Sequence, residues 1–221
     1  MDKNQLGIQA MKNGDLEKAA QHFTEAINED PSNPVLYVNF GNLLASINEF
    51  DKAENFFSKA LELDPKSATA LYGTGNVHYE NGKFEKAAQA FTAAMKEGLE
   101  EADAYFMTGM SLVQLNKEKL ALPYFMRAVE MNEGDTDARF QYGLCLASQG
   151  QIKQAAIEFQ KVAEMDPDHA DAFYNLGVAY SFEEKGQEAY DMFSKAVSIQ
   201  PDHVLALNGK KLMEEALKGS N

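Results

Sequence analysis

The sequence predicts an all-α protein, a superhelical solenoid of six antiparallel helix pairs that ends in a capping helix. Three residue types recur every 34 residues, and each fills all six periods. These columns are Gly7, Gly41, Gly75, Gly109, Gly143 and Gly177, then Ala19, Ala53, Ala87, Ala121, Ala155 and Ala189, then Phe23, Phe57, Phe91, Phe125, Phe159 and Phe193. Apolar residues also recur at helical spacing within each period, as in Leu16, Ala19 and Phe23. Such a fixed period indicates stacked repeats, each of which buries its apolar face against the next.

The period sets the expected boundaries. We expect repeats at 1–33, 34–67, 68–101, 102–135, 136–169 and 170–203, followed by a capping helix and short tail at 204–221. In each repeat, two helices are joined by a tight turn, for which Asn13-Gly14 and Asn81-Gly82 supply left-handed positions. Prolines such as Pro31 then stop the second helix, because the residue before a proline avoids the α region. We expect one continuous core without a domain boundary.

The invariant columns predict how the helices pack. Glycine and alanine are small enough to let paired helices approach closely, and phenylalanine then fills the gap between neighbouring pairs. A side chain in place of a glycine such as Gly75 should therefore overpack the pair. Lys3 and Arg139 depart from a position that is bulky and apolar elsewhere. Lys3 fits a first repeat with no preceding neighbour, whereas the sequence gives no reason for Arg139.

The last segment predicts a cap for the final apolar layer. Helical spacing over residues 204–218 gathers five apolar side chains, which we expect to face the last repeat: Leu205, Leu207, Leu212, Met213 and Leu217. The remaining positions are rich in Lys and Glu. Solenoids need such a terminal element with a polar outer face.

The order of a large residue, Leu-Gly, an aromatic, Ala, Phe, Ala and Pro over 34 residues resembles the tetratricopeptide repeat. The resemblance covers residues 1–203 and rests on three completely filled columns. It implies a right-handed superhelix whose first helices line a concave groove that binds proteins or peptides. Among family members, the chain is similar to stand-alone cytoplasmic repeat proteins of Gram-positive bacteria.

Composition narrows the classes of partner. The chain has 34 acidic and 20 basic residues, a net charge of −14. An acidic surface repels phosphate backbones and anionic lipids, so we expect neither nucleic acid nor membrane as a partner. A basic protein or peptide partner remains allowed. The single cysteine and the short apolar runs favour a cytoplasmic protein with no membrane span.

No pattern in the sequence predicts catalysis, a cofactor or a metal site. Nucleophile–base motifs, phosphate-binding glycine loops and metal-ligand spacings are missing from the chain. Cys145 stands between two leucines of a predicted helix, which favours a buried, unreactive thiol. His169 and His203 are repeat-equivalent and lie near Asp171, but loop-end polarity explains them better than a shared ion.

The resemblance places a partner-binding groove on the first helix of each pair. Its expected residues are Val38, Asn39, Asn42, Tyr72, Asn76, Tyr79, Phe106, Met110, Phe140, Leu144, Tyr174, Asn175 and Val178. Tyrosine and phenylalanine offer large rigid contact areas, and they are typical interface anchors. The alternative is that these residues pack between repeats. Asn39 and Asn175 resemble the asparagines with which some relatives hold a peptide backbone.

Three acidic residues with the same period, Asp103, Asp137 and Asp171, fall near the start of the first helix in repeats four to six. Carboxylates there meet the positive end of the helix dipole, which is a structural role. They could also form an acidic rim that attracts lysine or arginine of a ligand.

We therefore expect a monomeric protein-interaction scaffold, not an enzyme, that holds an extended peptide or a helix of a partner in its groove. Two alternatives stay open. The chain could be the peptide-sensing regulatory subunit of an enzyme complex, or it could be a self-assembling structural repeat protein. The sequence names neither the partner nor the pathway.

Overall fold

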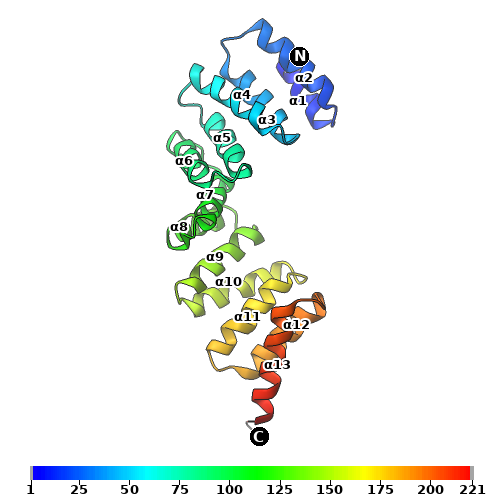
Figure 1. Ribbon diagram of the computed structural model, residues 1–221, viewed down its shortest axis with the longest axis vertical. Helices are drawn as coiled ribbons and strands as arrows, with labels where there is room; N and C mark the ends of the chain where they lie inside the picture. Colours follow the sequence, from blue (N-terminus) through cyan, green and yellow to red (C-terminus); the bar gives the residue numbers. More distant parts are fainter. Residues whose placement is uncertain (1, 220–221) are drawn as a thin grey trace. The chain divides into compact units, whose positions relative to one another are not determined.

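A computed structural model describes residues 2–219 and confirms the all-α class. It contains thirteen helices, and no strand occurs in that range. The chain divides into two compact units, with the division in the sequence between Lys117 and Glu118 (Figure 1). The first contains α1 (Lys3–Lys12), α2 (Leu16–Glu29), α3 (Pro34–Ser46), α4 (Phe50–Leu63), α5 (Ala68–Glu80), α6 (Phe84–Lys96) and α7 (Ala102–Gln114). The second contains α8 (Glu118–Met131), α9 (Thr136–Ser148), α10 (Ile152–Met165), α11 (Ala170–Phe182), α12 (Gly186–Ile199) and α13 (Val204–Gly219).

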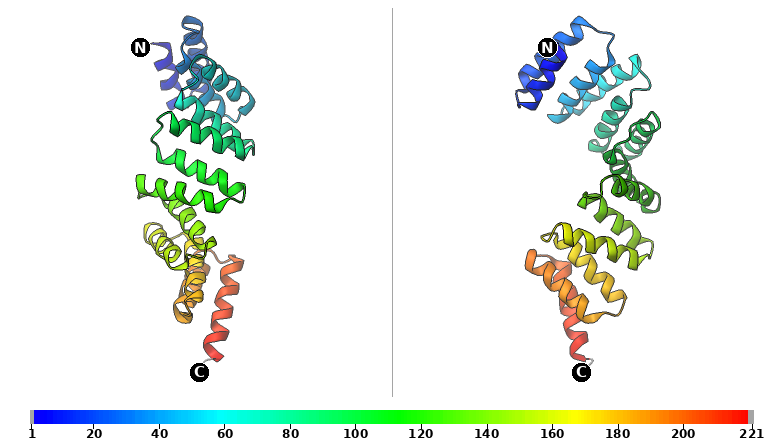
Figure 2. Two further views of the ribbon diagram at one scale, coloured as in Figure 1. Left: turned by 90° about the vertical axis from the view of Figure 1, so that its left-hand side faces the viewer. Right: turned by 180° about the vertical axis from the view of Figure 1, so that it is seen from behind.

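Consecutive helices pack as antiparallel pairs within each unit, as the sequence predicts (Figures 1 and 2). From the second repeat onward, every first helix begins at the expected residue: Pro34, Ala68, Ala102, Thr136 and Ala170. Polar side chains just before several of these starts accept a backbone N–H, as Asp135 does from Ala138 at 2.9 Å. The continuity of the core across residues 117–118 stays a prediction of the sequence.

The turn inside each repeat uses one left-handed residue at a fixed place. Positive φ occurs at residues 34 apart, namely Gly14, Asn48, Gly82, Asn116, Gly150 and Glu184. Glycine and asparagine adopt this conformation readily, so the Asn-Gly turns are confirmed. Glu184, with φ of 59°, is the one member of this column with neither type of side chain.

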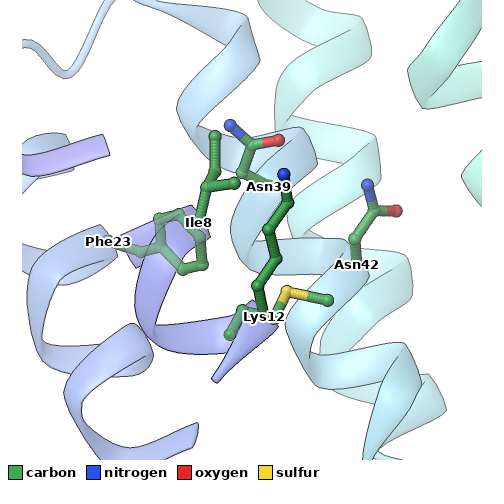
Figure 3. A pocket seen from close by; sticks show the side chains of 6 residues that line it. Ile8, Lys12, Phe23, Asn39 and Asn42 are labelled. Atoms are coloured by element: carbon green, nitrogen blue, oxygen red, sulfur yellow. The ribbon is translucent and has the colours of Figure 1, made fainter. Parts of the chain in front are cut away.

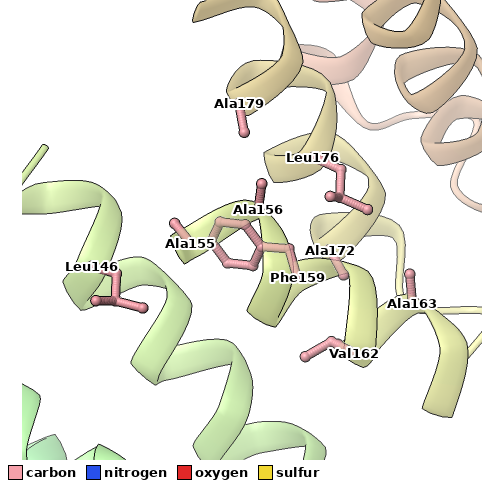
Figure 4. Packing of buried hydrophobic residues seen from close by; sticks show 9 residues of the cluster. All are labelled: Leu146, Ala155, Ala156, Phe159, Val162, Ala163, Ala172, Leu176 and Ala179. Atoms are coloured by element: carbon pink, nitrogen blue, oxygen red, sulfur yellow. The ribbon is translucent and has the colours of Figure 1, made fainter. Parts of the chain in front are cut away.

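The glycine and phenylalanine columns pack against each other as expected. The six phenylalanines are between 0% and 3% exposed. A Cβ atom on Gly75 would lie 2.5 Å from Cε1 of Phe91, and one on Gly41 would lie 2.8 Å from Cε1 of Phe57. Gly73 of the next repeat also approaches the ring of Phe57, so that this ring fills the gap between two repeats. In the second unit, Phe159 lies in a cluster shared by α9, α10 and α11 (Figure 4).

The structure explains Arg139. Its guanidinium is buried, and it donates to Oε2 of Glu158 at 2.6 Å and to the backbone oxygen of Glu133 at 2.9 Å. The positions equivalent to Arg139 and Glu158 in the second repeat hold Tyr37 and Phe56, whose ring centroids are 6.2 Å apart. A buried ion pair in the fifth repeat thus replaces an aromatic pair.

The prediction for the packed face of the last helix was wrong for three of its five residues. Leu205, Leu207 and Leu212 of α13 are 57%, 42% and 60% exposed. The helix instead packs through Ala206, which is fully buried, and through Gly209, where a Cβ would lie 2.8 Å from the ring of Phe193. The reason is register, because α13 packs on α12 as the first helix of a further repeat. It therefore buries the small residues of the first-helix pattern and not its own leucine stripe.

Candidate functional site

The first helices of the first unit form a continuous surface, because neighbours along the stack touch. Contacts join α1 with α3, α3 with α5, and α5 with α7, while no comparable contact joins the second helices within residues 2–117. The unit therefore bends with its first helices on the inside. We call this surface of α1, α3, α5 and α7 the inner face.

A pocket opens at the N-terminal end of the inner face (Figure 3). It has a volume of about 300 Å³ and is lined by Ile8, Met11, Lys12, Phe23, Asn39 and Asn42. These residues come from α1, α2 and α3, so the pocket lies where two repeats meet. Apolar walls with a few polar groups at the edge are typical of ligand sites.

The asparagines at the edge of this pocket were predicted groove residues. Asn39 donates from Nδ2 to Oδ1 of Asn4 at 2.8 Å, which links the first helices of two repeats. Asn42 is exposed beside it. Val38, by contrast, is only 5% exposed and belongs to a core cluster with Phe57, so its role is packing.

The tyrosines of the groove are held by their neighbours. The hydroxyl of Tyr72 donates to Oδ2 of Asp103 in the next repeat, and its ring lies 5.5 Å from that of Phe91. Burial is the main cause that raises the pKa of Tyr72 above its ordinary value, and the hydrogen bond to Asp103 adds to it. The ring of Tyr79 lies 5.3 Å from that of Phe84. Each tyrosine thus presents only part of its surface to a ligand.

The remaining groove residues are all partly exposed. They lie on first helices as expected and are Asn76, Phe106, Met110, Phe140, Leu144, Tyr174, Asn175 and Val178. Phe140 lies 5.7 Å from Phe159, and Leu144 packs against the same cluster. Asn175 donates from Nδ2 to the backbone oxygen of Asp171 at 2.8 Å, so this amide is used within its own helix.

The acidic rim residues Asp103, Asp137 and Asp171 are exposed in the first turns of α7, α9 and α11. This is where a carboxylate favourably meets the helix dipole. Two of them also have intramolecular partners. Asp103 accepts from Tyr72, and Oδ1 of Asp171 lies 3.2 Å from Nε2 of His203.

The two repeat-equivalent histidines have a structural role that the sequence reasoning missed. Nδ1 of His169 accepts the backbone N–H of Ala172 at 3.2 Å, and Nδ1 of His203 accepts that of Ala206 at 3.2 Å. Both therefore cap a helix, as Asp135 does 34 residues before His169. The repeat-equivalent positions 67 and 135 hold the helix-capping residues Ser67 and Asp135, and this pattern could have revealed the role.

Residues 2–219 hold no group of three or more side chains suited to a metal ion. Cys145 is 2% exposed, and burial raises the pKa of its thiol to about 11, which keeps it protonated. No helix in the described range is long and apolar enough to cross a membrane.

Comparison with known proteins gives a consistent result. Tetratricopeptide repeat models match residues 10–68, 72–136 and 170–203, and a TPR repeat model matches residues 143–181. The crystal structure of YrrB, reported as a TPR protein with an unusual peptide-binding site, is 50% identical. It covers 87% of this chain and 100% of its own, with a TM-score of 0.83.

Other relatives match less of the chain or only its fold. The TPR repeat-containing protein YrrB of Bacillus subtilis (strain 168) is 54% identical over 39 residues, which are 18% of this chain and 19% of that protein. The structure of Pseudomonas aeruginosa pilF is 19% identical with a TM-score of 0.79, covering 93% of this chain and 94% of its own. A MamA structure is 23% identical with a TM-score of 0.70, covering 77% and 93%. These last two show the fold alone.

Proposed function

Because the chain belongs to the tetratricopeptide repeat family, we propose that it binds a segment of a partner protein on the inner face and acts as a scaffold without catalysing a reaction. The observation that carries the proposal is the pocket beside Ile8 and Phe23, which is apolar inside and has amides at its edge. An apolar side chain of the segment enters this pocket. The reported peptide-binding site of YrrB supports the same kind of activity.

The geometry suggests how such a segment is held. Asn42 is exposed and can hydrogen-bond the backbone of a bound segment, while Asn39 is held by its hydrogen bond to Asn4. Tyr72 and Tyr79 follow along the inner face on α5, where their rings are anchored by Phe91 and Phe84. Preorganised aromatic side chains lose little entropy on binding, so they contribute more affinity than mobile ones. The scaffold works in the cytoplasm and as a monomer.

The test fills the pocket from its edge. Asn42→Phe places a ring over the cavity, and Asn55→Phe makes the same change at another exposed position, on α4. A displayed library of random peptides is selected against the parent protein, and the enriched peptides are titrated against both variants. We expect Asn42→Phe to weaken binding at least about tenfold, and Asn55→Phe to leave it unchanged.

Thermal unfolding of both variants checks that they are folded. Equal binding by Asn42→Phe and the parent would contradict a site in this pocket. Failure of the library to yield any peptide that binds the parent would contradict peptide binding itself.

A further inference from the structure

A second surface lies in the second unit, and none of the predicted groove residues lines it. Two adjoining cavities of about 510 and 370 Å³ run along α10 and the C-terminal end of α11. Both are lined by Lys153 and Glu183, so they adjoin and are treated together as one surface. We call it the α10–α11 surface, and its other main residues are Ile157, Lys161, Phe182 and Lys185.

Two large apolar side chains of this surface are open to solvent. Ile157 is 55% exposed and Phe182 is 71% exposed. The repeats provide an internal comparison for each position. Those equivalent to Ile157 are Gln21, Asn55, Gln89, Pro123 and Asp191, and those equivalent to Phe182 are Lys12, Ser46, Glu80, Gln114 and Ser148. The repeat fold therefore does not require an apolar residue at either place, and a surface that collects both has another use.

The charge of the surface is opposite to that of the chain. Its lining includes three lysines and one glutamate, in a protein with a net charge of −14. Lys153 stands where the first three repeats have acidic residues, namely Glu17, Asp51 and Glu85. The basic character is therefore local and specific to this part of the stack.

The lysines are held in place by neighbours that leave their side chains accessible. Nζ of Lys185 lies 2.5 Å from Oε2 of Glu183 and 5.3 Å from the centre of the Tyr180 ring. Nζ of Lys161 donates to Oε1 of Glu158 at 2.9 Å, and Glu158 is shared with Arg139. Lys161 and Lys185 remain 46% and 47% exposed. Both ammonium groups can therefore meet a further carboxylate.

We propose that the α10–α11 surface binds an acidic, amphipathic segment of a partner protein. Apolar side chains of the segment cover Ile157 and Phe182, and its carboxylates face Lys153, Lys161 and Lys185. Charge complementarity of this kind speeds encounter and selects the partner. The exposed apolar pair favours a protein ligand, and the acidic remainder of the chain repels a nucleic-acid backbone. The proposal does not depend on the inner-face site.

The experiment separates this surface from the inner face by blocking the latter. Random displayed peptides of the length of α10, 14 residues, are selected against the full chain carrying Asn42→Phe. The enriched peptides should combine Asp or Glu with Leu, Ile or Phe. The double variant Lys153→Glu/Phe182→Ser should weaken their binding at least about tenfold, and raising the salt concentration should weaken binding to the parent.

A matched control makes two comparable changes elsewhere in the unit, a lysine to glutamate and an exposed apolar residue to serine. Lys119 is the residue equivalent to Lys153 one repeat earlier, and Leu120 beside it is 58% exposed. Lys119→Glu/Leu120→Ser should bind the peptides as the parent does. Enrichment of basic or uncharged peptides, no enrichment at all, or equal binding by the Lys153→Glu/Phe182→Ser protein would overturn the proposal. So would binding of an oligothymidylate that depends on the same two residues, which would identify a general polyanion surface.

Discussion

At the residue scale, the buried Arg139 and Glu158 show how one repeat departs from its neighbours and remains folded. Both change together relative to Tyr37 and Phe56, so an aromatic contact is replaced by a charged one with matching partners. The guanidinium has a second acceptor on Glu133, and Glu158 also accepts from Lys161. Such a pair is stable only while both partners are present, because a single buried charge is costly.

This leads to a prediction about the pair. Glu158→Phe leaves the Arg139 charge buried, so it should lower the free energy of unfolding by about 3–5 kcal/mol. The double variant Arg139→Tyr/Glu158→Phe reproduces the pair of the second repeat and should recover most of that loss. Chemical denaturation of the three proteins measures this. A double variant less stable than Glu158→Phe alone would show that this ion pair cannot be exchanged for the aromatic pair of the second repeat.

The sequence predicted those residues whose environment is the same in every repeat. The phenylalanine column is an example, because the rings of Phe23, Phe57, Phe91, Phe159 and Phe193 each meet a glycine 16 residues earlier. Arg139 could not be explained from its own position, since its partner Glu158 lies on another helix. The capping role of His169 was missed for a different reason. Histidine is uncommon as a helix cap, although its column elsewhere holds Asp135 and Ser67.

At the element scale, α13 shows that register within the stack overrides the apolar stripe of a single helix. Its small residues Ala206 and Gly209 pack on the preceding repeat, while Leu205, Leu207 and Leu212 face solvent. The hydrophobic stripe of a single helix predicts its buried face only when that helix packs on a single neighbour. In a repeat stack, the neighbour is fixed by the period, and the period therefore predicts α13 better.

The packing of α13 can be tested with two substitutions. Gly209→Leu inserts a side chain against the ring of Phe193, and we expect it to cost about 1–3 kcal/mol of stability. Leu212→Ser changes a side chain that is 60% exposed, and we expect an effect within about 0.5 kcal/mol. Thermal or chemical unfolding compares them. A larger loss of stability in Leu212→Ser than in Gly209→Leu would show that the leucine stripe is the packed face.

The helix α5 carries a pH-dependent contribution to stability. Burial lowers the pKa of His78 below its ordinary value, and the nearby Glu54 only partly opposes this. Between the lowered pKa and about 6.5, the unfolded chain therefore binds more protons than the folded one. This contribution to stability is complete above about pH 6.5 and falls as the pH is lowered through that window.

Replacing His78 by leucine should reduce this pH dependence. Leucine stands at the equivalent positions 44, 112 and 146, so the substitution fits the repeat. We expect the melting temperature of His78→Leu to fall less than that of the parent between about pH 7 and pH 5. Parallel melting curves across a pH series for the two proteins would rule out His78 as the source.

At the scale of the whole molecule, the repeat separates the residues that build the fold from those available for binding. The three columns of glycine, alanine and phenylalanine are filled in every period, and positions facing solvent vary from repeat to repeat. The pocket beside Ile8 lies on first helices, while Ile157 and Phe182 belong to the α10–α11 surface. The sequence could predict the first surface from the family pattern. The α10–α11 surface could be found only from the structure, which gives the exposed fraction of each side chain.

The central claim is that the inner face of the first unit holds a peptide. Hydrogen–deuterium exchange of the full chain, with and without a peptide selected on the parent protein and sensitive to Asn42→Phe, tests it most directly. We expect slower exchange in α1 around Ile8 and in α3 around Asn42, with α2 and α4 little changed. Protection confined to the second helices, or to α10 and the end of α11, would contradict a binding site on the inner face.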